Sequence, residues 1–292
     1  MKKKSISEVG FTIGNTLFLL VITVCMLYPF LYTMSVSISD PVFVTKGEIL
    51  LLPKGLNLES YKVVLREPAF LRSYANTFFY SLTSTVISLL LLLVTAYPLS
   101  IKSLKGRNKV TMFFAFTMFF SGGMIPSYLV IRQLHMLDTV WAVILPGALS
   151  VWNLILCRTF LQGISESLRE SASIDGANDW IILFRIIVPL ATPLLAVMAL
   201  YVVVGQWNNY FGPFLYLSDT KLFPLQVVLR RILAQNKILN DGSLTDPTTA
   251  SRTVTATLRA AAMMVTVLPI ICVYPFLQKY FVKGIMVGAI KG

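Results

Sequence analysis

The 292-residue sequence is 56% hydrophobic and 13% charged, about half the charged fraction of an ordinary soluble domain, which argues against a soluble globular protein. Its formal net charge of +12 invites a nucleic-acid interpretation, but no DNA- or RNA-binding motif accompanies that charge. Basic residues on the cytoplasmic side of a membrane protein, where they meet anionic lipid, explain the charge equally well. We therefore expect membrane lipid, and no nucleic acid, among its partners.

Six apolar blocks are long enough to cross a bilayer as helices. A hydrocarbon core of about 30 Å requires about 20 apolar residues in helical form. None of the blocks shows the alternation of a transmembrane β-barrel. The sequence thus predicts an all-α polytopic membrane protein with one six-helix transmembrane domain over 11–282. The blocks cover roughly 11–36, 77–101, 110–131, 139–161, 190–212 and 260–282.

The distribution of basic residues predicts the orientation. Lys2–Lys4 precede the first block and four basic residues lie within 102–109, which places both segments in the cytoplasm. Six crossings then return the C-terminus to the cytoplasm. The first block is longer than a signal-peptide core and no clear cleavage site follows it, so we expect a retained anchor.

These expectations divide the chain into segments. Two long external segments, far above the usual connection length, are candidates to bind something outside the cell. Between the fourth and fifth blocks lies one long cytoplasmic loop. The expected segments are a cytoplasmic N-terminus over 1–10, external segments over 37–76 and 213–259, the loop over 162–189, and a cytoplasmic tail over 283–292.

The start of the loop carries helix-capping signals. Ser165 or Ser167 is expected to cap a short helix, with Ser167-x-x-Glu170 as a capping box. Asp175-Gly176 is expected to end this helix, because glycine accepts the left-handed conformation at a helix terminus.

A second helix is expected to follow this turn. Asn178 or Asp179 caps it, and it runs toward Pro189. The loop is therefore predicted to be a helix–turn–helix that lies against the cytoplasmic membrane surface.

The loop resembles the EAA motif of bacterial ABC importers, E-A-A-x3-G-x9-I-x-L-P. Glu170-Ser171-Ala172, Gly176 and Ile186-x-Val188-Pro189 match its spacing, with serine and valine replacing alanine and leucine. The run over 276–292 is similar to the end of maltose-type (MalG-like) carbohydrate permeases. Within that family the chain looks closest to the LplC/YtcP-like group.

This resemblance implies that the loop seats in a groove of a separate ATPase subunit. Small residues would let the ATPase approach the backbone, Glu170 would pair with a basic residue, and Asp175 would hold the turn. The alternatives, that Glu170 only caps its helix and Gly176 only ends it, stay open. The implied ATPase-coupling residues are Glu170, Ser171, Ala172, Asp175, Gly176 and Ala177.

Several chemistries lack their sequence signatures. No G-x-x-x-x-G-K-[ST] phosphate loop occurs, so we expect no enzyme and no cofactor in this chain, with ATP and Mg bound by partner ATPase subunits. His135 has no metal-ligand spacing around it and lies outside the apolar blocks, which disfavours both a metal site and an intramembrane serine protease. Cys25, Cys157 and Cys272 fall in three different blocks and show no pairing or redox motif.

A polar cluster in the fifth block, Gln206-Trp207-Asn208-Asn209, is the candidate substrate pathway. Polar groups in a membrane usually face a cavity or another helix, and aromatic faces beside amides suit sugars. An interfacial aromatic belt with interhelical amide bonds is the alternative. For the hydroxyl stripe Thr77, Ser81, Ser84 and Ser88, helix packing is the default expectation.

Together these features predict a permease of a binding-protein-dependent importer in a bacterial plasma (inner) membrane. Its expected cargo is an oligosaccharide, with acidic, uronate-containing or polysaccharide-derived ones as candidates. The expected partners are a second homologous permease, two ATPase subunits and an extracytoplasmic solute-binding protein. An ion-coupled secondary transporter, a permease for a non-sugar solute and a structural scaffold are the competing interpretations.

Overall fold

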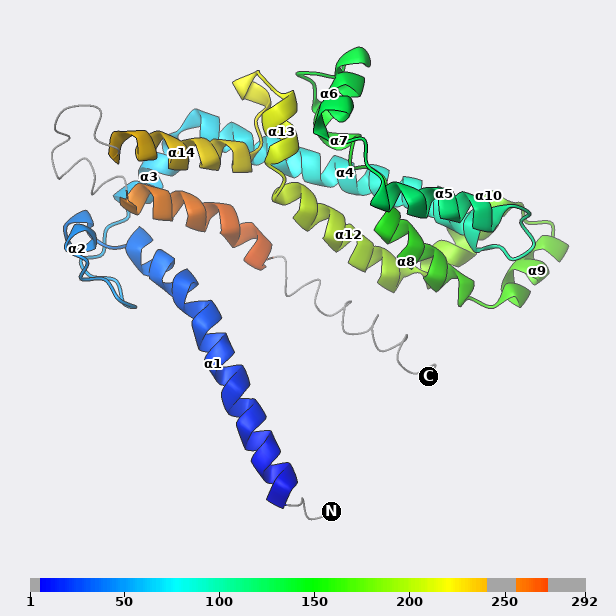
Figure 1. Cartoon of the computed structure of the whole chain (residues 1–292), viewed down its shortest axis with the longest axis horizontal. Coiled ribbons are helices and arrows are strands. Elements are labelled where there is room, and N and C mark those ends of the chain that lie inside the picture. Colours follow the sequence, from blue (N-terminus) through cyan, green and yellow to red (C-terminus); the bar gives the residue numbers. More distant parts are fainter. Residues whose placement is uncertain (1–5, 241–255, 273–292) are drawn as a thin grey trace. The chain divides into compact units, whose positions relative to one another are not determined.

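The computed structural model describes residues 6–240 and 256–272, and within them it is helical, with one isolated bridge between Ser39 and Leu56 (Figure 1). The predicted all-α class is therefore confirmed. The chain divides into two compact units, residues 1–70 with 229–268 and residues 71–228 with 269–292. The predicted tail over 283–292 lies outside the described residues, as does 241–255 of the second predicted external segment.

The first unit combines long and short helices, and polar contacts join several of them. The Ser37 and Tyr61 hydroxyls lie 2.7 Å apart, and Ser60 Oγ donates to Thr257 Oγ1 at 2.9 Å. Val36 is buried here with Ile49 and Ala260. The helices are α1 (Ile6–Ser37), α2 (Pro41–Thr45), α3 (Glu59–Arg66), the end of α14 (Leu225–Asn240) and most of Ala256–Cys272.

The second unit is built along α4 (Pro68–Ser100), which carries hydrophobic residues on most of its length. Further helices complete this unit along the chain. They are α5 (Arg107–Phe119), α6 (Met124–Gln133), α7 (Val140–Ile144), α8 (Val151–Gln162), α9 (Glu166–Ile174), α10 (Asp179–Ile181), the π-helical η1 (Ile182–Ile187), α11 (Val188–Leu190), α12 (Thr192–Trp207), α13 (Phe211–Tyr216) and the 3₁₀ turn η2 (Thr220–Leu222).

The structure agrees with some of the predicted membrane spans and not with others. Among the described residues, α1 and α4 are long and apolar enough to cross a membrane, and up to four spans result if each of two bent helix pairs counts as one. The pair α5 and α6 bends by 115°, and α10–α11 with α12 bends by 83°. Part of the block 260–282 lies outside the described residues. The count of six spans stays a prediction.

Three of the predicted blocks are interrupted in the structure, and the expectation of one continuous helix for each was wrong. The block 190–212 breaks at residues 208–210, between α12 and α13. The block 110–131 breaks at residues 120–123, where Gly123 adopts a φ of 83° that favours glycine. The block 139–161 breaks at residues 145–150, around Pro146. Leu145 still has helical geometry, but Pro146 lacks the N–H that would continue the helical hydrogen bonds, so α7 ends at Ile144.

Side chains of α4 hold the segment that leads into α14. Asn76 Nδ2 donates to the carbonyls of Lys221 and Phe223, at 2.7 and 3.1 Å. Thr77 Oγ1 accepts from the Leu225 N–H at 2.8 Å, and the Tyr80 hydroxyl donates to the Leu222 carbonyl at 2.8 Å. These bonds satisfy backbone groups that the 3₁₀ turn leaves open, and they fix the segment against α4.

Candidate functional site

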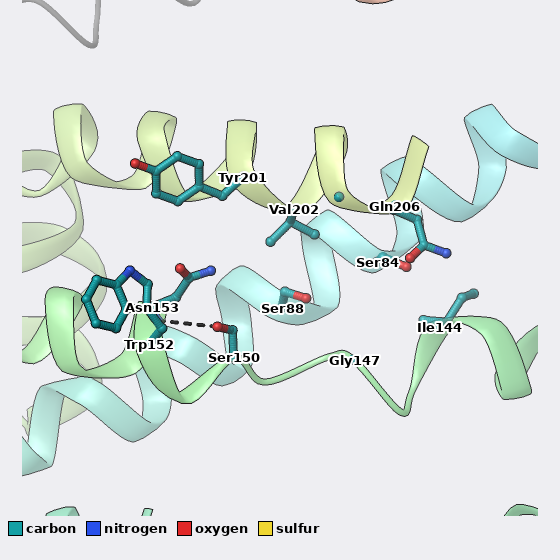
Figure 2. A pocket seen from close by; sticks show the side chains of 11 residues that line it. Ser84, Ser88, Ile144, Gly147, Ser150, Trp152, Asn153, Tyr201, Val202 and Gln206 are labelled. Atoms are coloured by element: carbon teal, nitrogen blue, oxygen red, sulfur yellow. Dashed lines mark hydrogen bonds between the residues drawn. The ribbon is translucent and has the colours of Figure 1, made fainter. Parts of the chain in front are cut away.

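A polar cavity of about 380 Å³ lies between α4, α12 and the connection from α7 to α8 (Figure 2). The break at 145–150 forms one wall, so non-helical backbone from an apolar block borders this cavity. Backbone of this kind is tolerated at membrane depth where it is buried in protein or faces water. The lining residues are Ser84, Ser88, Ile144, Gly147, Ser150, Trp152, Asn153, Tyr201, Val202, Gly205 and Gln206.

The start of α8 is fixed by its own cap. Ser150 is the N-cap residue, and its hydroxyl accepts a hydrogen bond from the Asn153 N–H at 3.4 Å (Figure 2). Serine suits this position because its oxygen satisfies an N–H that lacks a helical partner. The cap therefore holds Trp152 and Asn153 at the edge of the cavity.

The predicted pathway cluster separates into residues with different surroundings. Gln206 lines the cavity, whereas Trp207 is 4% exposed and packs edge-on against Tyr74 and Phe78. Asn208 Nδ2 donates to the Val204 carbonyl at 2.9 Å. Successive helical residues point about 100° apart, so four consecutive residues do not face one cavity.

Neither Asn208 nor Asn209 is among the residues that line this cavity. Asn208 Oδ1 also accepts from Gln226 Nε2 at 3.4 Å, which is the amide bonding between helices that the alternative interpretation expected. The residues that sequence reasoning missed are Ser84 and Ser88, which it assigned to helix packing, and the wall from 144 to 153. The signal for this wall was Pro146-Gly147, inside a block otherwise suited to a continuous helix.

Asp138 fastens the connection between α6 and α7. Its Oδ1 accepts from the N–H groups of Ser218 and Asp219, at 2.9 and 2.8 Å, and its own N–H donates to the Tyr216 carbonyl at 2.9 Å. The residue adopts a left-handed φ of 60°. Both accepted bonds favour the ionised carboxyl and lower the pKa of Asp138. This clamp joins the α7 side of the cavity to the end of α13.

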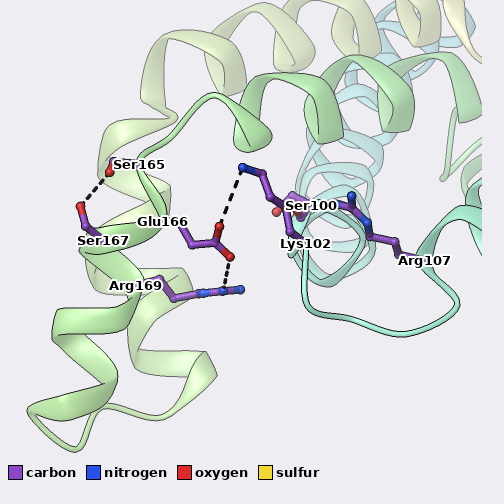
Figure 3. Close-up of polar contacts among 7 residues, drawn as sticks. All are labelled: Ser100, Lys102, Arg107, Ser165, Glu166, Ser167 and Arg169. Carbon is purple, nitrogen blue, oxygen red and sulfur yellow. Dashed lines mark hydrogen bonds and ion pairs between the residues drawn. The ribbon is translucent and has the colours of Figure 1, made fainter.

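The second candidate site is the elbow, residues 163–190, which contains α9, α10, η1 and α11 (Figure 3). Its first helix begins after Ser165, which makes no side-chain cap bond, and the hydroxyls of Ser165 and Ser167 lie 2.7 Å apart. The predicted capping box of Ser167 and Glu170 is therefore wrong. With Ser165 at the N-cap, the third helical position is Leu168, which has no polar group to return a bond.

The turn of the elbow is held mainly by backbone bonds. The N–H of Gly176 donates to the Ser173 carbonyl at 3.1 Å, and that of Ala177 to the Ala172 carbonyl at 2.9 Å. This is a Schellman ending, and Gly176 supplies its left-handed residue with a φ of 84°. Asn178 Oδ1 then accepts from the Ile181 N–H at 2.9 Å and caps α10.

An ion-pair cluster ties α9 to the end of α4. Glu166 Oε1 lies 2.9 Å from a nitrogen of Arg169, and Glu166 Oε2 lies 3.9 Å from Lys102 Nζ (Figure 3). These groups border a second cavity of about 230 Å³, together with Tyr97 and Ser100. Glu166, which sequence reasoning did not select, therefore forms ion pairs within the chain, and the Glu-x-x-Arg spacing of Glu166 and Arg169 was its signal.

The predicted coupling residues differ in how far their side chains are exposed. Glu170, Ser171, Asp175 and Gly176 are exposed, and Ala177 is half-buried. Ala172 is buried in this chain's own core, where its small side chain lets α9 pack on η1. The expectation that Ala172 is open to a partner is therefore corrected.

Apolar side chains are also exposed on the elbow. Ile174 is 87% exposed at the end of α9. Trp180 stacks on Phe184 with ring centres 6.1 Å apart. Trp180 is 58% exposed, and Phe184 and Leu168 are each 45% exposed. Apolar side chains gathered beside a defined turn are typical of a surface that binds another protein. Sequence reasoning named only the small and acidic residues of this surface.

Comparison with known proteins covers nearly the whole chain. The family model described as "Binding-protein-dependent transport system inner membrane component" matches residues 5–287. Protein LplC of Bacillus subtilis is 39% identical over 97% of this chain and 95% of its own length. The polygalacturonan/rhamnogalacturonan transport system permease YtcP of Bacillus subtilis is 36% identical over 94% of this chain and 96% of its own length.

A solved structure is similar to the fold described above. It is a chain of a bacterial ABC transporter involved in the import of the acidic polysaccharide alginate. The two chains share 35% of their residues and superpose with a TM-score of 0.87, over 96% of this chain and all of the other.

Proposed function

This chain belongs to the family of binding-protein-dependent transport system inner membrane components, and from this premise we propose that it is the permease subunit of an ATP-driven oligosaccharide importer. The single observation that carries the proposal is the likeness, over almost the full chain, to a subunit of an alginate importer. The relative YtcP, named for polygalacturonan and rhamnogalacturonan transport, supports cargo derived from acidic polysaccharides. The chain's part is transport, without bond chemistry of its own.

The elbow is the proposed point of contact with the ATPase. Glu170 and Ser171 are exposed on α9, and Ile174 is exposed at its end, two residues before Gly176. A partner subunit can therefore contact the acidic, small and apolar groups together. The turn is held by its own backbone bonds, so the surface is formed before the partner binds.

Several partners follow from this assignment. Two ATPase subunits would bind ATP and Mg, a second homologous permease would complete the pathway, and an extracytoplasmic solute-binding protein would deliver the oligosaccharide. Closure of the ATPases would move the elbow and rock the helices between inward- and outward-facing states. Both termini would then lie in the cytoplasm.

The experiment reconstitutes the whole transporter in proteoliposomes, with its second permease, ATPases and binding protein. It measures uptake of labelled oligogalacturonide, alginate oligosaccharide and neutral galacto-oligosaccharide with and without ATP. We expect ATP-dependent uptake of an acidic oligosaccharide. Uptake driven by an ion gradient without ATP would instead identify a secondary transporter, and transport of none of the three would refute the proposed cargo class.

A variant tests the coupling surface within the same assay. Glu170→Arg is expected to weaken ATPase association and substrate-stimulated hydrolysis, because it reverses the charge presented at the elbow. Arg66→Glu on α3 is the matched control, since it also reverses an exposed charge but lies outside the elbow. If the Glu170→Arg transporter hydrolyses ATP and imports like the control, the coupling assignment is wrong.

A further inference from the structure

Two serine hydroxyls in α4 are buried without a hydrogen-bond partner in the described part of the chain. Ser84 is 4% exposed and Ser88 is 6% exposed, and both line the polar cavity. By contrast, Thr77 and Thr85 of the same helix donate to backbone carbonyls one turn earlier, at 2.8 and 2.7 Å. A buried hydroxyl without a partner is costly, so these two serines point to a group that enters the cavity.

Polar and aromatic side chains face these serines from other elements. The Gln206 amide comes from α12, and Asn153 comes from the first turn of α8 (Figure 2). Tyr201 and Trp152 bring aromatic rings to the same cavity. A few convergent polar groups among apolar and aromatic ones, within about 300–1,000 Å³, are typical of a small-molecule site.

We propose that this cavity is a sugar subsite in which Ser84, Ser88 and Gln206 bind the hydroxyl groups of one ring of the passing oligosaccharide. A sugar ring offers hydroxyl edges to serine and amide groups, and an apolar face to Tyr201 or Trp152. The inference rests on the proposed function and deepens it, because it places a substrate contact in this permease subunit. Gln206, the one member of the predicted cluster that lines the cavity, becomes part of this subsite.

The chemistry of the lining also decides which groups of the sugar this subsite recognises. None of the residues that line the cavity carries a charge. A sugar carboxylate placed against these groups would lack a cation, and an unpaired charge in such surroundings is strongly disfavoured. This subsite therefore binds hydroxyl groups and does not select for acidity. The charge of a uronate must be balanced by other parts of the transporter.

Ser81 provides a matched control within the same stripe. Its hydroxyl is also buried and unpartnered among the described residues, and it lies on α4 one turn before Ser84. It lines a different and apolar cavity of about 180 Å³ with Phe78, Leu82 and Trp207 among its neighbours. An unpartnered serine by itself therefore does not define the subsite, whereas the convergence of polar groups does.

The test compares Ser84→Ala/Ser88→Ala with Ser81→Ala in the reconstituted transporter. The probes are tetragalacturonide and its carboxyl-reduced neutral counterpart, each delivered on saturating binding protein. The measured quantity is the number of oligosaccharides imported per ATP hydrolysed. We expect this ratio to fall roughly tenfold for both probes in the double variant, as for the loss of two neutral hydrogen bonds, and to stay within about twofold in Ser81→Ala.

A purely structural defect would lower ATP hydrolysis and import together and leave their ratio unchanged. The proposal is overturned by an unchanged ratio in the double variant, by an equal fall in Ser81→Ala, or by an effect confined to the acidic probe. Binding-protein-stimulated hydrolysis that persists in the double variant shows that the transporter remains folded and coupled to its ATPases.

A labelling experiment separates this inference from the proposed cargo class. Single cysteines replace Ser81, Ser84 or Ser88 in a transporter whose three native cysteines have been replaced. A charged, water-soluble methanethiosulfonate is expected to label positions 84 and 88 faster than position 81 during ATP turnover. If wild-type protein imports neither probe, the cargo proposal fails, yet this pattern still supports a water-filled pathway at the cavity, and equal labelling at all three positions refutes it.

Discussion

Replacing Gly176 with alanine tests whether the turn of the elbow needs a residue that accepts the left-handed conformation. Gly176 has a φ of 84°, and a Cβ added there meets no atom within 4 Å in this chain. The cost of alanine is therefore in the backbone, about 1–2 kcal/mol for the left-handed region. That cost reduces the population of the intact turn about 5- to 30-fold relative to alternatives. If the ATPase binds only the intact turn, its affinity falls by up to this factor.

Gly176→Asn is the matched comparison, because asparagine tolerates the left-handed region better than alanine does. The assay is the affinity of the ATPase subunits for the permease pair in nanodiscs, with wild type measured alongside. We expect alanine to weaken binding clearly more than asparagine. If asparagine is as harmful as alanine or worse, the conformational argument is refuted, and glycine is required because the ATPase approaches its backbone closely.

Three further predictions concern the elbow and the Asp138 clamp. Ala172→Leu overfills a buried position and should destabilise the permease by about 1–3 kcal/mol in thermal unfolding of the reconstituted protein. Ser171→Leu, at the neighbouring exposed position, should change its stability by less than about 0.5 kcal/mol. Ile174→Asp should leave the unfolding temperature unchanged and weaken ATPase binding, because the side chain is exposed. The stabilisation from Asp138 should be complete above its ordinary pKa of 3.8 and should disappear as the pH falls through its lowered pKa in the folded protein. The reason is that protonation of the carboxyl weakens the hydrogen bonds from Ser218 and Asp219. Asp138→Asn should remove this pH dependence of the unfolding temperature.

The elbow shows how far local sequence rules reach. The glycine that ends α9 was predictable, since only a residue that accepts positive φ fits a Schellman ending, and similar rules limited the cap of α10 to Asn178 or Asp179, of which the structure shows Asn178. Ser165, one of the two predicted cap residues, stands at the N-cap position of α9, and the capping box of Ser167 and Glu170 was wrong because the helix begins two residues earlier than that box requires. The inward direction of Ala172 was not predictable, because it depends on how η1 packs against α9.

The cavity shows a case in which the average hydropathy of an apolar block does not predict its helical structure. A block of suitable length predicts a span, but the average does not reveal that Pro146 divides the block 139–161 into two helices. Serines inside an apolar helix usually bond their own backbone, as the threonines of α4 do, so sequence alone gave no reason to separate Ser84 from Thr85. Only the arrangement of α4, α8 and α12 shows which hydroxyls face a polar space.

The elbow and the cavity are joined by one continuous hydrophobic cluster. Ala172, Ile182, Leu183 and Ile187 of the elbow pack with Leu92, Leu93 and Leu99 of α4, Leu154 and Cys157 of α8, and Met198 of α12. The same three helices carry most of the lining of the cavity, and Leu99 lies eleven positions after Ser88 on α4, about 16 Å along the helix.

Close-packed interiors shift as units, because their side chains interdigitate with few voids. A displacement of the elbow by its ATPase is thus expected to move α4, α8 and α12 together at their clustered ends. The connection at 145–150 is not helical, but its Leu149 packs against this same cluster, so we expect the adjoining wall of the cavity to follow the movement through side-chain contacts.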